Sequence, residues 1–494
     1  MSSIKTTKMT NYRWIICAML FLATTVNYMD RQVLSLTFPG EGGIQQEFGW
    51  SDEDYGTITA YFSIIYAVCM LFAGKFVDWM GTSKGYLWAI FVWSTGAVLH
   101  AFCGIATCGL VAGEWAVGFE GAKEVLRSFC ESGAADAALA ISATSVWLFL
   151  GARCILALGE AGNFPAAIKV TAEYFPKKDR AFATAIFNSG ASVGALIAPF
   201  TIPVLAKFFG WEMAFIVIGA LGYVWMGFWI FLYKKPNQNP KVNAAELTYI
   251  NQDVETDSDP KDATDDGPAI GFLKCFTYRQ TWSFIVGKFM TDGVWWFFLF
   301  WTPAYLKAQF EINPTDVEGM VLIFVLYLIT MLSILGGKLP TFFINRGMNA
   351  YAGRMRAMLI FAFFPLLGLF AQPLGGVFNT PWFPIILIGI LGAAHQSWSA
   401  NIFSTVGDMF PKSTIATITG IGGMAGGVGS FLINKGAGAL FTYAETQGEA
   451  FSFVGFEGKP AGYMIIFCIC AVAYLVGWVI MKMLVPKYKP VIAE

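Results

Sequence analysis

Twelve apolar stretches, each long enough to cross a lipid bilayer, constrain this chain more than any other feature. A helix that spans the hydrocarbon core needs about 20 mostly apolar residues. Windows of this kind fall near residues 14–36, 57–77, 86–108, 144–171, 181–206 and 212–233, and again near 281–306, 319–340, 355–374, 382–407, 414–440 and 462–484. Because 56% of the residues are hydrophobic and only 13% are charged, a soluble globular fold is excluded. We predict an all-α integral membrane protein with twelve transmembrane helices in two groups of six.

Charged side chains lie inside several of these apolar stretches. Asp30 and Arg31 are adjacent in the first one. A charge at bilayer depth costs at least ~2.5–3.5 kcal/mol on insertion scales, so such residues normally face a water-filled path or a partner inside a bundle. The other residues of this kind are Arg153, Glu160, Lys288, Asp292 and His395. Repeated charge within membrane segments indicates a passage for a charged solute.

Lysine and arginine are distributed unequally between the two sets of predicted loops. If both termini are cytoplasmic, most of the loop Lys and Arg residues fall on the inner side, as the positive-inside rule requires. The polar N-terminal segment is short and no small-residue cleavage site follows it, so no removable signal peptide is expected. We expect a multi-pass protein of a bacterial cytoplasmic membrane.

Two polar segments interrupt the apolar pattern. Residues 234–280 are rich in Pro, Asn, Asp and Lys, which indicates a cytoplasmic linker, with one short helix near 244–252, between an N-terminal bundle at 1–233 and a C-terminal bundle at 281–494. Residues 111–143 form an outer insertion whose Ala, Glu and Lys content indicates a small helical cap.

The cysteines do not indicate a cofactor. The 9 Cys residues lie mostly in apolar stretches and lack C-x-x-C or Cys/His spacing, so neither a metal site nor a redox motif is predicted. A disulfide among Cys103, Cys108 and Cys130, on or near the outer face, stays open. The absence of a nucleophile–base pair and of a cofactor fingerprint argues against an enzyme.

The two halves of the chain are related by an internal repeat. At a constant offset of 235 residues, EYFPK at 173–177 aligns with DMFPK at 408–412, and NSGASVG at 188–194 then aligns with GMAGGVG at 423–429. In the same register Glu160 aligns with His395. The glycine-rich stretch that includes 423–429 has no preceding strand and no following Lys-Ser/Thr, so close helix packing explains it better than a nucleotide loop.

A short loop joins the second and third apolar stretches. It reads GKFVDWMGTSK and has an acid one turn after its first glycine and a lysine at its end. This loop resembles the signature loop of the major facilitator superfamily, although Trp79 stands where a basic residue is common. The resemblance implies that the loop gates the cytoplasmic side through Gly74, Asp78, Gly81 and Lys84.

Four further strings resemble the anion:cation symporter family of that superfamily, and in particular its hexuronate transporters. They are NYMDRQV at 27–33, GEAGNFPAAI at 159–168, KFMTDGVWWF at 288–297 and HQSWSAN at 395–401. Together they extend over nearly the whole chain. The outer insertion at 111–143 departs from the compact pattern of the family.

A hexuronate site needs a cation for the carboxylate, hydrogen-bonding groups for the hydroxyls and an aromatic face for the ring. Arg31 is our candidate for the carboxylate clamp, since a planar guanidinium holds an anion through two parallel hydrogen bonds. The resemblance implies that Arg153 and Glu160 belong to the coupling network, with Arg153 also near the substrate. We predict Asp30 and Glu160 as proton carriers; a static salt-bridge latch is the alternative.

The C-terminal half supplies the remaining candidate ligands. Lys288 either pairs locally with Asp292, one turn away, or meets the substrate. One of Trp295 and Trp296 is expected to stack on the sugar ring. His395 is either a helix-to-helix hydrogen bond or a functional group. Further candidates, the last three by resemblance, are Gln396, Asn401, Tyr66 and Asn188.

Charged residues at the cytoplasmic ends of equivalent spans in both halves form another set. Latch pairs between the halves, which break on opening, are one interpretation, and snorkelling to the membrane interface is the other. The set consists of Lys169, Glu173, Arg180 and Asp408.

The sequence thus predicts a proton-coupled symporter that imports hexuronates by alternating access between two bundles. Its expected partners are a small anionic sugar acid, protons and the lipid bilayer, without nucleic acid, metal or cofactor, and the expected state is a monomer. Transport of another sugar acid, such as an aldonate or aldarate, or of another organic anion is the nearest alternative. A ligand sensor that does not transport is a third, and the short linker and tail leave it no signalling domain.

Overall fold

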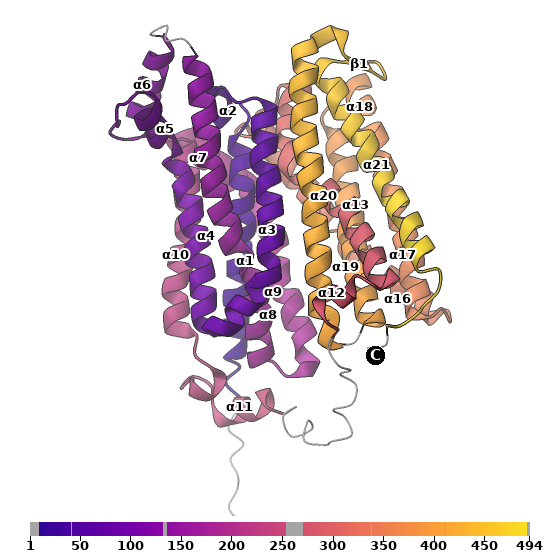
Figure 1. The fold of residues 1–494 in the computed structure, drawn as a ribbon. Helices are drawn as coiled ribbons and strands as arrows, with labels where there is room; N and C mark the ends of the chain where they lie inside the picture. The colour runs from indigo at the N-terminus through magenta and orange to yellow at the C-terminus, as the bar shows by residue number, and fades with distance from the viewer. Residues whose placement is uncertain are drawn as a thin grey trace, which may run out of the picture.

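The computed structural model describes residues 9–40, 42–131, 136–252, 270–336, 338–410 and 412–491. It is almost entirely helical, with a single described hairpin of two antiparallel strands, β1 (Ser452–Phe453) and β2 (Phe456–Glu457). Figure 1 shows two helical bundles side by side, one from each half of the chain. Part of the predicted linker, residues 253–269, lies outside the described residues.

The N-terminal bundle contains six long helical segments that pack around one another. Two of them are compound: α4 bends by 53° into α5, and α7 continues as α8. The segments are α1 (Arg13–Thr37), α3 (Asp52–Met80), α4 (Thr82–Ala101) with α5 (Cys103–Val111), α7 (Ala137–Glu160) with α8 (Asn163–Tyr174), α9 (Lys177–Phe209) and α10 (Trp211–Leu232). Two short helices, α2 (Ile44–Phe48) and α6 (Phe119–Glu131), lie in the connections.

The C-terminal bundle repeats this plan with more breaks. Its helices are α13 (Arg279–Phe310), α14 (Val317–Thr330), α15 (Ser333–Gly336), α16 (Leu339–Asn345), α17 (Ala350–Phe363), η2 (Phe364–Leu367), α18 (Gly368–Val377), α19 (Trp382–Met409), α20 (Lys412–Gln447), η3 (Gly448–Ala450) and α21 (Gly458–Leu484). The linker contributes η1 (Pro236–Gln238), α11 (Ala244–Ile250) and α12 (Phe272–Cys275). The predicted linker helix is therefore present as α11.

Each of the twelve predicted spans falls on one of these long or broken helices. Seven described helices are long and apolar enough to cross a membrane, and the bent pair α4 and α5 makes an eighth. The predicted span at 319–340 is not one helix, because α14 ends at Thr330 and α16 starts anew with Pro340 in its first turn, where proline fits a helix start. Helices α1 and α13 are less apolar than these seven helices because they carry buried charged residues such as Arg31 and Lys288.

Two ends of the molecule are distinguished by their short helices. At the end that we call the cap end, α6 lies within the predicted insertion at 111–143. At the opposite end, the linker end, α11 lies below the N-terminal bundle (Figure 1). The carboxylate of Glu246 on α11 accepts hydrogen bonds from the backbone N–H groups of Tyr12 at 2.8 Å and Arg13 at 3.0 Å. An acid is favoured there because these amides begin α1 and have no partner within the helix.

Helices α3 and α20 form the main contact between the two bundles (Figure 1). A Cβ atom on Gly56 would lie 2.6 Å from the backbone oxygen of Asn434, and one on Gly438 would lie 2.6 Å from that of Asp52. Only glycine permits this approach of the two backbones. Close packing was predicted for the glycine-rich stretch that includes 423–429, and it is present there as well: a Cβ on Gly427 would lie 2.9 Å from the backbone oxygen of Ser63, and one on Gly429 would lie 2.2 Å from that of Phe289.

Candidate functional site

A buried ion pair joins α1 to α7 in the N-terminal bundle. Nε of Arg31 lies 2.7 Å from Oε2 of Glu160, and the side chains are 7% and 0% exposed. A charge-assisted hydrogen bond of this length is among the strong ones that a protein forms. The arginine and the acid that the sequence predicts as anion clamp and proton carrier therefore contact each other directly.

Aromatic rings surround the guanidinium of Arg31. Its Cζ lies 4.5 Å from the ring centre of Tyr66, 5.0 Å from that of Tyr28 and 5.6 Å from that of Trp296. Tyr28 and Tyr66 belong to the N-terminal bundle, whereas Trp296 is on α13 of the other one. Arg31 thus lies at the boundary of the two bundles, and cation–π attraction holds its charge among flat rings.

Arg153 on α7 binds the backbone of α1 at Arg31. Its Nη2 donates a hydrogen bond of 3.0 Å to the backbone oxygen of Arg31, and its Cζ lies 4.7 Å from the ring centre of Phe62. Its Nε and Nη1 atoms have no hydrogen-bond partner among the described residues. The side chain is fully buried, so it positions α1 against α7 and adds positive charge beside Glu160.

Asp30 faces the interior of the N-terminal bundle. Only 2% of it is exposed, and neither carboxyl oxygen has a hydrogen-bond partner among the described residues. The side chains that act electrostatically on this carboxyl include Glu160, Arg153 and the indole of Trp93 on α4. A carboxyl in such surroundings is a chemically reasonable proton carrier.

The C-terminal half contains its own buried ion pair. Nζ of Lys288 lies 2.7 Å from Oδ2 of Asp292, one turn along α13, and 4.3 Å from the ring centre of Phe403. Of the two interpretations of Lys288, the structure contains the local pair. Asp292 packs tightly against α20, because a Cβ on Gly426 would come within 2.2 Å of its Oδ2.

The two tryptophans of α13 face different partners. Trp295 stacks on the imidazole of His395, with ring centres 5.4 Å apart and planes 3° apart, whereas Trp296 contacts Arg31. Nδ1 of His395 also forms a 2.6 Å hydrogen bond with the hydroxyl of Tyr474 on α21. His395 therefore makes a helix-to-helix hydrogen bond, and Trp296 is the ring beside the candidate clamp.

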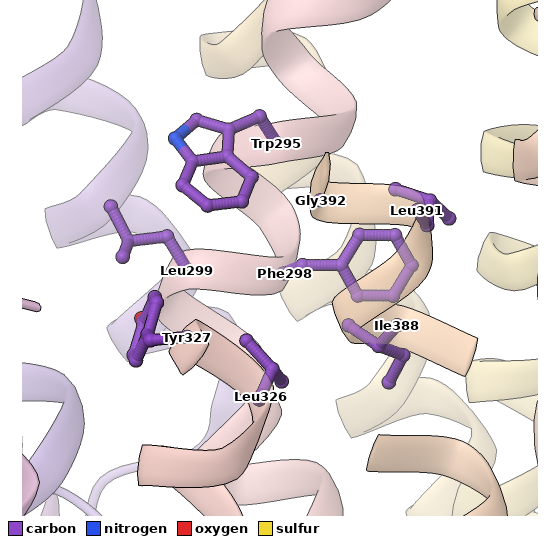
Figure 2. Close-up of a pocket in the computed structure, with 8 residues that line it drawn as sticks. All are labelled: Trp295, Phe298, Leu299, Leu326, Tyr327, Ile388, Leu391 and Gly392. Atoms are coloured by element: carbon purple, nitrogen blue, oxygen red, sulfur yellow. The ribbon is translucent and has the colours of Figure 1, made fainter. Parts of the chain in front are cut away.

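A small apolar hollow lies next to Trp295 (Figure 2). Its walls come from α13, α14 and α19, and its volume of about 10 Å³ holds roughly one water molecule. It is therefore too small and too apolar for a sugar acid. The lining residues are Trp295, Phe298, Leu299, Leu326, Tyr327, Ile388, Leu391 and Gly392.

The remaining predicted ligands are dispersed. Asn401 is buried and its Nδ2 donates to the backbone oxygen of Ser397, one turn earlier in α19. Gln396 is half-buried on the same helix. Asn188 lies on an exposed face of α9, so the structure does not bring it into the buried cluster around Arg31.

The predicted gating residues lie toward the linker end. Gly81 has a φ of +80° between α3 and α4, a conformation that glycine adopts without strain, while Gly74 is half-buried and Lys84 is exposed. Lys169 is half-buried on α8. The side chains of Asp78, Arg180 and Asp408 lie outside the described residues.

Glu173, a predicted latch between the halves, is hydrogen-bonded within its own half. It accepts from the hydroxyl of Thr82 at 2.6 Å and from that of Tyr233. These groups tie together the linker ends of α4, α8 and α10.

Ion pairs between the halves occur at the cap end, and sequence reasoning missed them. Lys459 binds Asp52 at 2.6 Å and Lys435 binds Glu53 at 3.1 Å. The hydroxyl of Tyr55 also donates to the backbone oxygen of Phe300 at 2.6 Å. Nothing in the sequence near Asp52 points to partners so distant in the chain. The two bundles are therefore fastened together at the cap end.

Within the described residues, no group of three or more His, Cys, Asp or Glu side chains is arranged to hold a metal. Cys103 and Cys108 are buried, Cys130 is exposed, and all three thiols are free. The disulfide that the sequence left open is not formed in the structure.

The sequence model of the family described as the Major Facilitator Superfamily matches residues 20–433 of the chain. The chain belongs to this superfamily. The predicted fold is thereby confirmed, and the protein is a multi-pass membrane transporter rather than an enzyme. The resemblance drawn from the signature loop at 74–84 was correct.

Curated relatives are similar along most of the chain. A hexuronate transporter of Escherichia coli K12 is 28% identical over 434 residues, which is 88% of each chain. A probable galactarate/D-glucarate transporter of the same organism is 25% identical over 463 residues, 92% of this chain and 94% of the relative. A D-galactonate transporter of Escherichia coli O6:H1 is 23% identical over 435 residues, 87% and 89% of the two chains.

Solved structures show the same fold at lower identity. A bacterial homologue of the human lysosomal transporter Spinster, in an inward-facing and occupied conformation, matches with a TM-score of 0.62 and 18% identity over 96% of this chain and 97% of that one. A D-xylose–proton symporter matches with a TM-score of 0.62 and 14% identity, over 97% and 98% of the two chains.

Proposed function

We propose that the protein imports a hexuronate, such as glucuronate or galacturonate, together with protons across a bacterial inner membrane. The observation that carries this proposal is the contact between Arg31 and Glu160 at the boundary of the bundles. The similarity to a hexuronate transporter along most of the chain supports the substrate class. The basic residues of the loops support a cytoplasmic position for the linker end and both termini, and the protein is proposed to act as a monomer.

The Arg31–Glu160 pair provides a physical reason for coupling. While Glu160 is ionised, its negative charge neutralises the guanidinium of Arg31. The carboxylate of the sugar acid must therefore compete with Glu160 for Arg31. Protonation of Glu160 removes its charge and releases Arg31 to the substrate. Proton and anion then enter together, because neither alone satisfies the buried charges.

Asp30 and Arg153 are the other two buried charged residues beside the Arg31–Glu160 pair, and we call these four residues the charge set. Asp30 is buried without a partner among the described residues, a situation that is costly for a carboxylate unless it carries a proton. Its protonation state therefore changes the charge felt by Arg153 and Glu160. We assign Asp30 the second proton-carrying role and Arg153 the role of positioning Arg31.

Trp296 completes the substrate site from the opposite bundle. Because it contacts the Arg31 guanidinium across the boundary, a sugar ring that stacks on Trp296 would place its carboxylate beside Arg31. Binding would then draw the two bundles together, as alternating access about a midplane site requires. Closure at the cap end through Lys459 and Asp52 agrees with a site that opens toward the linker end.

Another sugar acid is the second candidate substrate. The relatives include a probable galactarate/D-glucarate transporter and a D-galactonate transporter, and each of these compounds carries a carboxylate that Arg31 could bind. Competition by unlabelled uronates, aldonates and aldarates against labelled galacturonate separates the candidates.

The test is uptake of labelled galacturonate into membrane vesicles that contain the protein. We expect accumulation that a protonophore abolishes and that replacement of sodium leaves unchanged. Uptake that requires sodium and does not respond to pH would overturn the proton coupling. No uptake of any sugar acid would overturn the substrate class.

A further inference from the structure

A series of buried polar groups without protein partners begins at the proposed proton carriers. Among the described residues, both carboxyl oxygens of Asp30, Oε1 of Glu160 and Nε1 of Trp93 have no hydrogen-bond partner. One turn beyond Glu160 toward the linker end, Nδ2 of Asn163 is unpartnered too, while its Oδ1 accepts from the hydroxyl of Tyr86 at 2.7 Å. None of these five residues is more than 2% exposed.

The series continues along α10 to the linker end. The ring of Tyr86 packs on that of Trp229, with centres 5.2 Å apart, and Nε1 of Trp229 has no partner among the described residues. Trp229 stacks on Tyr233 at 4.3 Å, whose hydroxyl donates to the half-buried Glu173. Hydrogen bonds and stacked aromatic rings thus connect Asn163 with Glu173 at the linker end, within one bundle.

Such a concentration of unpaired groups indicates a ligand, and the smallest one that fits is water. More than about 90% of buried polar groups in proteins are hydrogen-bonded to protein or to ordered water, because an unpaired buried group loses its hydration without compensation. Buried waters typically bind several polar groups that lack protein partners. Carboxyl oxygens, an amide and two indole N–H groups supply both acceptors and donors for them.

The contact between Arg31 and Glu160, where the substrate is proposed to bind, lies at the boundary of the bundles and not on the side of these unpartnered groups. Arg31 and Oε2 of Glu160 meet at the boundary where Trp296 reaches in from the other bundle, whereas Asp30 faces Trp93 on α4. Helix α4 packs on α7 and α10 of its own bundle. Proton and substrate can therefore approach the carboxyls from different directions.

We propose that these residues form an N-bundle seam, which holds ordered water and carries the coupled proton from Glu160 to the linker end, apart from the passage of the sugar acid. The seam consists of Asp30, Trp93, Glu160, Asn163, Tyr86 and Trp229, and it ends at Glu173. The carboxylic acid of Glu160 gives its proton to a seam water, successive waters pass a proton to the solvent near Glu173, and the Glu160 carboxylate re-forms its pair with Arg31. This inference rests on the proposed proton coupling.

The functional test compares Tyr86→Phe with Tyr305→Phe in proteoliposomes. Tyr305 is a control of similar burial, since it is 1% exposed; its hydroxyl has no partner among the described residues, and it belongs to α13 of the other bundle. We expect Tyr86→Phe to lower uptake driven by a pH gradient about tenfold, the kinetic equivalent of one hydrogen bond. Exchange of labelled for unlabelled substrate at equal pH should stay at the wild-type rate, and Tyr305→Phe should change neither process.

Two outcomes overturn the seam: unchanged proton-driven uptake in Tyr86→Phe, or an equal loss of exchange, which would indicate a structural role. Asn163→Ala repeats the test at a second position if Tyr86→Phe does not fold. Wild-type uptake that does not respond to a pH gradient would instead remove the proposed proton coupling itself.

Hydroxyl-radical labelling of the wild-type protein by X-ray radiolysis tests the water directly, with no variant and no transport. Radicals form at bound water, so Trp93 and Trp229 should be oxidised despite their burial. Trp301 is the control, because it is equally buried but its Nε1 donates to Asn434 at 2.9 Å. Labelling of Trp93 and Trp229 no faster than that of Trp301 would show that the seam is dry and would overturn the inference.

Discussion

Asp30 and Arg31 are consecutive on α1 but face different parts of the protein. Arg31 contacts Glu160 and the aromatic rings at the boundary of the bundles, and Asp30 is enclosed within the N-terminal bundle. Successive residues of a helix differ in direction by about 100°, so one short segment supplies an anion-binding cation to one side and a carboxyl to the other. In the proposed mechanism, this arrangement would link substrate and proton through a single helix.

Replacement of Arg31 should remove substrate binding. We expect Arg31→Ala to abolish the thermal shift that sugar acids produce on the purified protein. Arg31→Lys keeps the charge but loses the planar fork of donors, so it should weaken binding roughly tenfold, or about 1.4 kcal/mol. Arg127→Ala, an exposed arginine on α6, is the control. A full thermal shift in Arg31→Ala would show that another group binds the carboxylate.

Neutralisation of Glu160 should separate binding from proton coupling. Glu160→Gln copies the protonated acid, so Arg31 stays available to the substrate at every pH. We expect binding that no longer depends on pH and exchange that persists, without accumulation driven by a pH gradient. Glu124→Gln, which removes an exposed acid on α6, should behave as wild type. Gradient-driven accumulation by Glu160→Gln would assign the coupled proton to another residue.

The sequence allowed the helices and the buried charges to be predicted because both depend on local composition. An apolar stretch indicates a membrane span by its composition alone. A charge within it, such as that of Arg31, is unusual wherever its partner lies. Pairings between distant segments could not be predicted in the same way. Asp52 and Lys459 look like ordinary residues at span ends, and only the folded chain brings them together.

Glu173 illustrates a second limit. Its position in the internal repeat suggested a latch to the other half, yet the hydroxyls of Thr82 and Tyr233 occupy its oxygens. The repeat reports equivalent positions but not which neighbour a side chain binds. Likewise, two adjacent tryptophans could not be ranked by sequence, and the structure separates Trp295, on His395, from Trp296, on Arg31.

The cap end should respond to pH through Glu47. Burial raises the pKa of this carboxyl from 4.5 to about 7. The hydrogen bond from Trp211 and the charge of Lys123 lower this pKa, whereas the charges of Glu212 and Glu120 raise it. The folded state therefore binds more protons than the unfolded state between these two values. The contribution of Glu47 to stability is greatest below pH 4.5 and is lost as pH rises toward about 7.

The measurement is the melting temperature of wild type minus that of Glu47→Gln. This difference should fall as pH rises through the window from 4.5 to about 7. Glu124→Gln again provides the control, because this acid is exposed, and its difference should not vary with pH. A pH-independent difference for Glu47→Gln would show that its carboxyl titrates normally in the folded protein.

Removal of Glu246 should release the linker from the N-terminal bundle. Its carboxylate is 0% exposed and binds Nη1 of Arg13 at 3.1 Å, the backbone N–H groups of Tyr12 and Arg13, and the hydroxyl of Thr10 at 2.6 Å. Loss of one member of a buried ion pair costs roughly 3–5 kcal/mol, so Glu246→Ala should lower the melting temperature clearly. It should also speed hydrogen exchange at the start of α1 and in α11. Thr248→Ala, an exposed change on the same helix, should leave both unaltered, and slow exchange in Glu246→Ala would show that apolar contacts alone hold α11 in place.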